Sequence, residues 1–284
     1  MIIDFHTHVF PPQIKKNRSK YIESDPCFAI LYSDKNARLA TVDELIDSMD
    51  KASVDVSVIL NIGWTTHELC VETNDYILES IARYPDRLVG FCSVQPRSFQ
   101  AALDELERCA QGGIKGVGEI RPDIQLLDLY DEVLMAPFTD TLKKHNLILL
   151  THSSEPVGHI YSGKGAVTPE VLYPFIVSHP ELNVICSHWG GGLPFYALMP
   201  EVKKAMPNVY FDTAASPFLY SPQIYGQVAA IIGGDKILFG SDYPLLAQER
   251  LIKEVESSDL PTETKTQILA GNAKRLLGIT DKTI

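Results

Sequence analysis

The sequence has no long hydrophobic run, since no apolar stretch in its 284 residues approaches the roughly 20 residues that a membrane-spanning helix needs. The N-terminal stretch MIIDFHTH has the pattern of a strand and lacks the pattern of a secretory signal. Low-complexity segments are also lacking, and 45% hydrophobic with 21% charged residues indicate a globular chain. We therefore expect a cytoplasmic protein without a membrane partner.

Positive charge is scarce: 25 lysines and arginines stand against 36 aspartates and glutamates, which leaves a formal net charge of −11. An acidic chain disfavours nucleic acids and anionic membranes as partners. It still allows an anionic small-molecule substrate, because a bound cation can invert the local electric field.

Paired cysteine motifs are lacking as well. The chain has five cysteines, an odd number, and none stands in a CxxC motif. Cys92 and Cys186 fall within apolar, strand-like runs, where a free thiol behaves as a small hydrophobic side chain. This usage predicts a reducing compartment and no disulfide bonds.

Short apolar runs alternate with longer amphipathic segments along the whole chain. Such strands, separated by helices, are typical of a parallel sheet that helices cover on both faces. A Gly-rich dinucleotide fingerprint is missing after the first run, which weighs against an open doubly wound sheet. We therefore predict that residues 1–284 form a single α/β domain, a (β/α)8 TIM-type barrel. The predicted strands cover residues 2–8, 54–62, 88–94, 114–120, 147–152, 184–188, 209–213 and 237–242.

Two insertions interrupt the rhythm of strands and helices. Residues 10–40 separate the first strand from its helix, and residues 153–168 follow the fifth strand. Both come after the C-terminal ends of strands, where a barrel of this type places its active site. We expect them to be lid or pocket-wall loops. Pro137 lies in an otherwise helical run, where we expect a break or kink.

Side chains that can bind a metal stand at the ends of several predicted strands. His6 and His8 are two residues apart on the first strand, so their side chains point to the same side. Buried imidazoles and carboxylates at one rim of a barrel need partners, and a divalent cation serves all of them. Unrelated structural roles are the alternative, and the number of coincident strand ends weighs against it. The other strand ends carry Glu119, His152, His188 and Asp242.

These stretches resemble the amidohydrolase superfamily, in particular the amidohydrolase-2 branch with aminocarboxymuconate semialdehyde decarboxylase and resorcylate decarboxylase-like proteins. The resemblance covers essentially the whole chain and implies a barrel of the metallo-dependent hydrolase type. The matching stretches are DFHTHVFPP at 4–12, GVGEIRPD at 116–123, LLTHSS at 149–154, VICSHWGGGLPFY at 184–196, VYFDTAASP at 209–217, ILFGSDYPL at 237–245 and GNAKRLLG at 271–278.

The resemblance implies roles for individual residues. His188 activates the metal-bound water or handles the substrate proton, and Asp242 can also accept a proton from bound water. Mixed nitrogen and oxygen ligands with one open position suit a catalytic zinc ion, which lowers the pKa of bound water and polarises the substrate. The implied ligands, usually for zinc, are His6, His8, His152 and Asp242.

Glu119 admits two roles. Other branches of the superfamily use a carboxylate on this strand to bridge two metals. In that case His152 and His188 would hold the second metal, and Asp242 alone would be the base. Alternatively, Glu119 pairs with Arg121 or hydrogen-bonds the histidines of the first strand. We favour one metal, because the nearest resemblance is to the mononuclear branch.

Four further residues are candidates for contacts with the substrate. Arg121 and His159 follow metal-bearing strands and could hold a substrate carboxylate, with an internal ion pair as the alternative for Arg121. Trp189 and Tyr243 stand at strand ends and could stack on a ring, although aromatic residues at such positions also serve simple packing.

These residues predict a metal-dependent hydrolase that opens an ester, lactone or amide bond of a small carboxylated substrate. The alternative is a non-oxidative decarboxylase of an aromatic or dienoic acid, in which His188 or Asp242 protonates the ring carbon. A metal-free binding barrel is a third hypothesis, which the complete set of ligands disfavours. By analogy with relatives that pair, we expect a homodimer.

Overall fold

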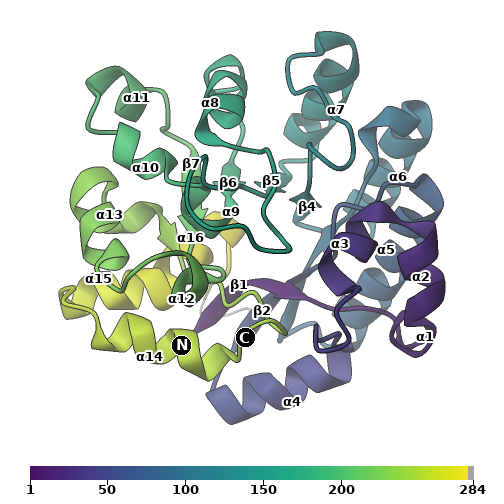
Figure 1. Ribbon diagram of the computed structural model, residues 1–284, viewed down its shortest axis with the longest axis horizontal. Helices are drawn as coiled ribbons and strands as arrows, with labels where there is room; N and C mark the ends of the chain where they lie inside the picture. Colours follow the sequence, from purple (N-terminus) through teal and green to yellow (C-terminus); the bar gives the residue numbers. More distant parts are fainter. Residues whose placement is uncertain (281–284) are drawn as a thin grey trace.

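The computed structural model describes residues 1–280 and shows a barrel of eight parallel strands with helices around it (Figure 1). Each strand pairs with the next one in sequence. The end of the sheet returns to its beginning, where the Phe5 amide donates to the Phe239 carbonyl at 2.7 Å. This arrangement confirms the predicted TIM-type barrel. The strands are β1 (Ile3–His8), β2 (Val56–Leu60), β3 (Leu88–Cys92), β4 (Gly116–Ile120), β5 (Ile148–Thr151), β6 (Val184–Cys186), β7 (Val209–Asp212) and β8 (Ile237–Leu238).

Local sequence specifies several of the outer helices. Thr41 and Glu44 form a capping box at the start of α4 (Val42–Ala52), and Leu45 and Met49 are buried on the inner face of this helix. The capping residues and the spacing of the apolar residues therefore both specify a helix at this position. The other main helices are α5 (His67–Arg83), α6 (Gln100–Gln111), α7 (Glu132–Lys144), α8 (Pro169–Ser178), α13 (Ile224–Ile232) and α14 (Gln248–Ser257).

Shorter helical segments join these strands and helices. They are α9 (Ser187–Gly190), α10 (Leu193–Tyr196), α11 (Pro200–Lys204), α12 (Ser216–Leu219), α15 (Thr262–Thr266), α16 (Asn272–Leu277), the turns η1 (Pro96–Ser98) and η2 (Gly234–Lys236), and the π-helical η3 (Gln267–Gly271).

Pro137 does not end its helix, so of the expected break or kink the break does not occur. It lies inside α7, five residues after the first residue of the helix. The missing amide therefore removes only a hydrogen bond to the carbonyl of Val133 in the first turn. Because Val133 is exposed, water can hydrate that carbonyl instead.

A layer of apolar side chains fills the barrel below the ends of the strands. Its members come from six strands and include Phe5, Val58, Phe91, Leu150 and Ile185, all buried. The rings of Phe5 and Phe91 meet edge to face with their centroids 5.7 Å apart. These residues come one to three positions before the polar residues at their strand ends. The layer therefore forms a packed floor beneath the predicted site.

Residues 10–40 form a helical wall rather than the expected loop. They fold into α1 (Pro12–Lys16), α2 (Arg18–Ser24) and α3 (Pro26–Tyr32). Phe10, Phe28, Tyr32 and Trp64 pack together there, with the rings of Phe28 and Trp64 stacked at 5.4 Å. This aromatic cluster holds the helices against the barrel, and the burial of its rings explains why the segment is ordered.

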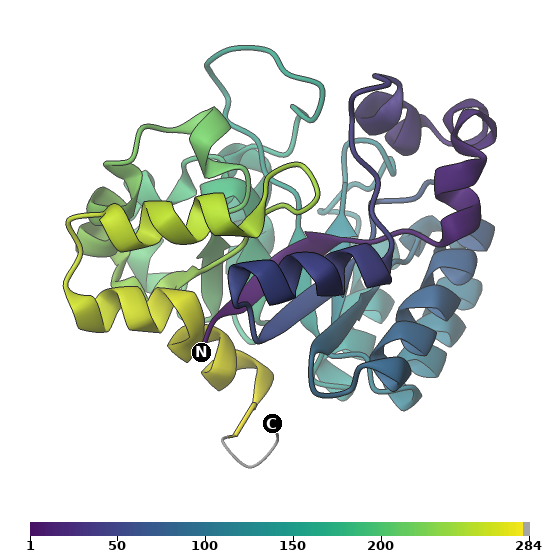
Figure 2. The same cartoon turned by 90° about the horizontal axis from the view of Figure 1, so that it is seen from below.

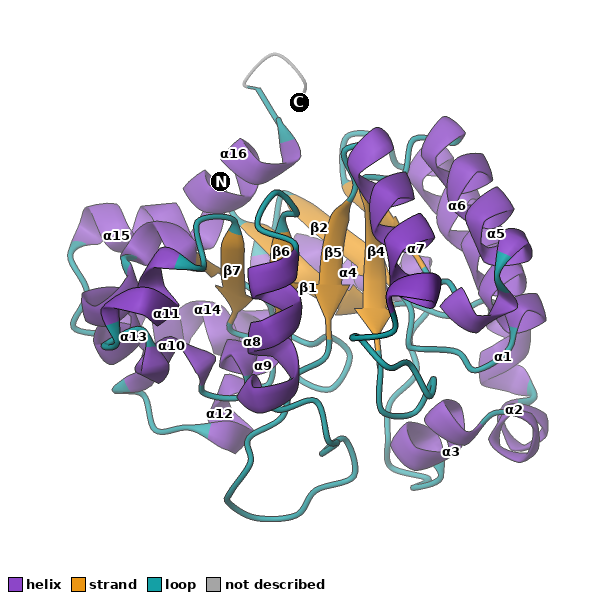
Figure 3. Ribbon diagram, turned by 90° about the horizontal axis from the view of Figure 1, so that it is seen from above, coloured by secondary structure: helices purple, strands orange, loops and turns teal. Residues whose placement is uncertain are grey.

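Residues 153–168 form a long irregular loop without helix or strand, as expected. The strand arrows point toward this loop (Figure 3). The loop and the α1–α3 segment lie at one end of the molecule, and the C-terminal helix lies at the other (Figure 2). Both insertions thus border the end of the barrel that carries the C-terminal ends of the strands.

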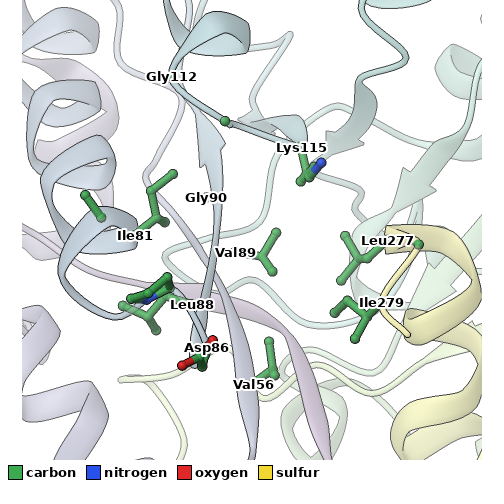
Figure 4. Close-up of a pocket in the computed structure, with 14 residues that line it drawn as sticks. Val56, Ile81, Asp86, Leu88, Val89, Gly90, Gly112, Lys115, Leu277 and Ile279 are labelled. Atoms are coloured by element: carbon green, nitrogen blue, oxygen red, sulfur yellow. The ribbon is translucent and has the colours of Figure 1, made fainter. Parts of the chain in front are cut away.

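The opposite end of the barrel, where the strands begin, has a pocket of about 370 Å³ (Figure 4). Val56, Leu88 and Lys115 at the beginnings of strands contribute to its walls, together with Leu277 and Ile279. Its lining includes none of the predicted site residues. Separately, no helix within residues 1–280 is long and apolar enough to cross a membrane.

Candidate active site

The metal-competent residues meet at the C-terminal end of the barrel. A β-bulge between Asp4 and Thr7 interrupts the alternation of β1, so that His6 follows the floor residue Phe5 directly into the site. The Nε2 atoms of His6 and His8 are 3.0 Å apart, which confirms that the two side chains converge. Asp242, from the segment after β8, places Oδ1 3.3 Å from the His8 Nε2 atom.

Glu119 lies in the middle of the cluster. One carboxylate oxygen is 2.9 Å from the His152 Nδ1 atom and 3.3 Å from the His188 Nε2 atom, and the other is 3.9 Å from the His8 Nε2 atom. Two sets of three donor groups therefore share this residue, and within each set the donor atoms lie within 4.8 Å of one another. The sets are His6, His8 and Glu119, and Glu119, His152 and His188.

Hydrogen bonds define which ring nitrogen of two histidines faces the centre. The Nδ1 atom of His6 is 2.9 Å from Oδ2 of Asp212, and the Nδ1 atom of His188 is 3.2 Å from the carbonyl of Ala214. Both partners only accept, so each Nδ1 carries a proton. In a neutral ring the Nε2 lone pair is then free and points toward Glu119 or His8. The donor set of neutral imidazoles and carboxylates fits a divalent cation such as zinc or manganese.

Charge within the cluster calls for a positive ion. Burial lowers the pKa of His6, but the carboxylates of Asp212, Asp242 and Glu119 outweigh it and raise that pKa to about 10. The pKa of His188 rises to about 9, because Glu119 and Asp242 outweigh burial in the same way. Protons on these rings therefore balance the carboxylates, and a divalent cation can take their place.

His152 differs from these two histidines. Burial and the nearby Arg121 guanidinium lower its pKa to about 4. A neutral imidazole is the form that binds metals, so His152 is ready to act as a ligand at neutral pH.

A cavity of about 380 Å³ opens above the cluster. Arg121 and His159, the two residues predicted to contact a substrate carboxylate, both line it. Arg121 is 1% exposed, its Nη2 atom lies 3.3 Å from Asp123, and its buried Nε has no hydrogen-bond partner among residues 1–280. The internal ion pair left open by the sequence is therefore present, while the Nε–H is left unsatisfied.

Trp189 and Tyr243 do not reach this cavity, contrary to the expected ring stacking. Trp189 is fully buried, and its Nε1–H donates to Ser216 Oγ at 2.9 Å. The Tyr243 hydroxyl donates to the carbonyl of Glu44 at 3.0 Å. The backbone at Trp189 is left-handed, with φ of 58°, which directs the ring into the surrounding helices, where it packs against Tyr225.

Sequence reasoning missed two residues of the site. Asp212 contacts His6 and closes the apolar run VYFD at 209–212, the same strand-end position that identified the candidate metal ligands. That signal could have revealed it. Arg38 lines the cavity, but nothing in its local pattern sets it apart, because its position depends on the folding of residues 10–40.

Comparison with known proteins places the chain among enzymes of one family. The Amidohydrolase family model matches residues 3–279. The 2-amino-3-carboxymuconate-6-semialdehyde decarboxylase of Dictyostelium discoideum is 22% identical over 98% of this chain and 91% of its own. The gamma-resorcylate decarboxylase of Rhizobium radiobacter is 24% identical over 74% of this chain and 76% of its own.

A solved structure agrees with the fold. The 5-carboxyvanillate decarboxylase of Novosphingobium aromaticivorans, in complex with manganese and 4-hydroxy-3-methoxy-5-nitrobenzoic acid, superposes with a TM-score of 0.82. The two chains are 18% identical, and the match covers 98% of this chain and 96% of the other. Since the family match extends over nearly all described residues, the protein belongs to the amidohydrolase family of enzymes.

Proposed function

We propose that this protein is a metal-dependent, non-oxidative decarboxylase of an aromatic or dienoic acid. The observation that carries the proposal is the convergence of imidazole and carboxylate donors around Glu119 at the base of a cavity. Both named relatives are decarboxylases, which favours the alternative from the sequence. They do not support the hydrolase that the sequence placed first.

The metal centre follows from the donor atoms. A divalent cation, when bound, would hold an oxygen of the substrate and stabilise the negative charge that develops during the reaction. Nitrogen and oxygen donors suit both the zinc expected from sequence and the manganese found in the related structure. The residues that would hold the ion are His6, His8, Glu119, His152 and Asp242.

His188 is the residue that we assign to proton transfer. Decarboxylation breaks the bond between a carbon and its carboxylate, leaves the electron pair on that carbon and releases CO2, so a proton must take the vacated position. The Nδ1–H of His188 is held by the Ala214 carbonyl, which leaves Nε2 as the atom that gives up and regains a proton. His188 also lines the cavity, where the substrate carbon would lie.

The cavity walls favour an acidic substrate with an apolar skeleton. Arg38, Arg121 and His159 can contact anionic groups, whereas Leu31 and Phe218 offer apolar surface. The guanidinium of Arg121 is partly balanced by Asp123. Arg38 is exposed at the cavity and has no ion pair within the described residues, so it is the more available cation.

The loop at 153–168 serves as a lid in this proposal. His159 and Tyr161 on the loop line the cavity. Hydrogen bonds pin its base, since Ser154 N–H donates to the Val167 carbonyl at 2.8 Å and Ala166 N–H donates to Asp123 at 3.1 Å. A loop whose two ends are held by hydrogen bonds, and whose middle can move, can close over the site and exclude water from it.

The test compares acids with esters. Chelator-treated protein, reloaded with Mn²⁺ or Zn²⁺, is given hydroxylated benzoic acids, dienoic acids and matched aryl esters and lactones. We expect CO2 release from at least one acid and, in D2O, one deuterium at the vacated carbon. Hydrolysis of an ester or lactone without CO2 release from any acid would replace the proposal with the hydrolase.

A variant tests the role of His188. His188→Asn should lower kcat by about 100-fold or more, the range expected for loss of a general acid, while the metal content stays unchanged. His179→Asn is the matched control, because His179 lies at the end of α8 and does not line the cavity. Full activity of His188→Asn would remove His188 from the mechanism.

A further inference from the structure

Asp212 is a fully buried carboxylate that contacts two parts of the site at once. Its Oδ2 atom accepts from His6 Nδ1 at 2.9 Å. Its Oδ1 atom accepts from the backbone amides of His188 at 2.8 Å and Ala214 at 3.1 Å. Oδ2 therefore bonds His6, a proposed metal ligand, and Oδ1 bonds the backbone of His188, the residue assigned to proton transfer.

The backbone that carries His188 adopts a conformation that needs support. His188 and Trp189 have φ values of 54° and 58°, in the left-handed region that L residues avoid. Three glycines follow with positive φ, so that the turn continues through residue 192. Gly191 allows the close approach, since a Cβ there would meet the Ser154 carbonyl at 2.3 Å.

The last residue of β7 and the segment after it hold this left-handed turn in place. Asp212 holds the amide of His188, the Ala214 carbonyl holds its ring, and Ser216 Oγ accepts from the Trp189 indole at 2.9 Å. The position of the His188 ring is thus set by residues 212–216 rather than by its own strand.

We propose that Asp212 is a positioning residue that selects the metal-binding tautomer of His6 and fixes the backbone that aims His188. The proposal rests on the metal-dependent function inferred above. Because Asp212 accepts from Nδ1, the Nε2 lone pair of His6 stays directed at His8 and the metal position. The Asp212 carboxylate thus links the orientation of the His6 ring to the position of His188.

An asparagine at this position would reverse the tautomer. Two backbone amides point at Oδ1, so the amide oxygen must face them and the NH2 group must face His6 Nδ1. The NH2 group donates, which forces His6 to accept at Nδ1 and to carry its proton on Nε2. A ring in that form cannot bind the metal through Nε2. Turning the amide around would instead oppose its NH2 to two N–H donors.

The experiment measures metal affinity directly. Mn²⁺ and Zn²⁺ titrations by calorimetry on chelator-treated protein compare wild type, Asp212→Asn and Asp25→Asn. Asp25 is the matched control, since it is buried and accepts from the amides of Phe28 and Thr65 away from the metal ligands. We expect Asp212→Asn to weaken metal binding by about 10- to 100-fold, and Asp25→Asn to lower the melting temperature only.

A spectroscopic readout separates positioning from a general loss of structure. In the zinc form with ¹⁵N-labelled histidine, His6 should show a protonated Nδ1 in the wild type and not in Asp212→Asn. Asp212→Glu, which keeps two accepting oxygens, should retain this signal and bind metal more tightly than Asp212→Asn even if it is less stable. If Asp212→Asn does not fold, the Asp212→Glu variant can still be compared with the wild type.

The outcomes distinguish a failure of the proposed function from a failure of the positioning role of Asp212. Wild-type protein that binds neither metal would overturn the proposed function and, with it, the role of Asp212. Wild-type binding together with equal affinity in Asp212→Asn, or an unchanged Nδ1 proton in that variant, would overturn the positioning role and leave the proposed function intact.

Discussion

At the residue scale, Glu119 is the residue on which the number of metal ions in the proposed site would depend. It is the residue shared by both sets of donor groups, and its carboxylate lies within 4.8 Å of the donor atoms of both sets. The sequence offered a bridging role and a supporting role for it. The distances of 2.9 Å and 3.3 Å to His152 and His188 place it among the donors themselves.

Glu119→Gln should therefore lower metal content. The amide keeps the size of the side chain but removes a negative charge and one accepting oxygen, so we expect metal affinity to fall about 10-fold or more. Elemental analysis per chain is the measurement, with Glu105→Gln as control, because Glu105 is a buried carboxylate on α6 that bonds Asn74 and Arg108. About two ions in wild type, with fewer in Glu119→Gln, would assign a bridged pair. Equal content in both proteins would contradict a ligand role.

The raised pKa values of two histidines predict how metal binding depends on pH. The pKa values of His6 and His188, about 10 and 9 against the ordinary 6.5, keep both rings protonated in metal-free protein at neutral pH. A proton must leave His6 Nε2 before that atom can bind a cation. Affinity should thus increase between about pH 6 and pH 8, by about tenfold per unit for each proton released.

Calorimetry in buffers of different ionisation enthalpy counts the protons that metal binding releases.

The same raised pKa values affect folding stability in the opposite direction, because stability falls as pH rises. A folded-state pKa raised above the unfolded value stabilises the protein only while the group is protonated, so metal-free protein should lose stability as pH rises from about 6.5 toward 10. Metal affinity that stays constant from about pH 6 to about pH 8 would contradict the assigned protonation states.

At the scale of elements, the loop at 153–168 is the part that the proposal expects to move. The Tyr161 hydroxyl donates to Glu155 at 3.0 Å, and Lys164 donates to the carbonyls of Val157 and His159. These bonds lie within the loop, and Val157 and Ile160 at its tip are 75% and 86% exposed. The tip therefore has little apolar packing to hold it in place.

Tyr161→Phe should loosen this loop. We expect faster hydrogen exchange within 153–168 and a several-fold higher KM, with kcat changed less, because the catalytic groups lie on the barrel. Tyr196→Phe is the control, since Tyr196 is exposed on α10 and does not line the cavity. Unchanged exchange in the loop together with a raised KM would mean that Tyr161 contacts the substrate and does not latch the loop.

Sequence predicted the elements whose pattern is local. Near-continuous apolar runs identified the strands, and because the C-terminal ends of parallel strands meet at one rim, the sequence alone was enough to group His6, His8, Glu119 and Asp242. Helices of five to seven residues, such as α1, have too little periodicity to be recognised, and they depend on packing around Trp64.

The direction of Trp189 could not be predicted for a related reason. The glycines at 190–192 allow many backbone conformations, and the left-handed one is selected by contacts from residues 212–216, which are distant in sequence. The sequence therefore showed that Trp189 follows a strand end, but not the direction in which its side chain points.

At the scale of the whole molecule, the chain is net negative, whereas the wall of the cavity carries the exposed cation Arg38. A formal charge of −11 would repel the acidic substrate proposed above at long range, whereas Arg38 would attract it at the cavity. Salt screens both effects over about 10 Å. The position of a cation, rather than the total charge, should therefore determine how fast an acidic substrate is captured.

Two charge-matched variants separate these effects. Arg38→Gln and Arg83→Gln both make the chain more negative by one charge, but Arg83 lies in an exposed ion pair with Asp43 and does not line the cavity. We expect kcat/KM to fall about tenfold in Arg38→Gln, the loss of one charge-assisted hydrogen bond, and to stay within about twofold in Arg83→Gln. The advantage of wild type over Arg38→Gln should shrink as salt is added. Equal losses in both variants would mean that the overall field governs capture and that Arg38 makes no specific contact.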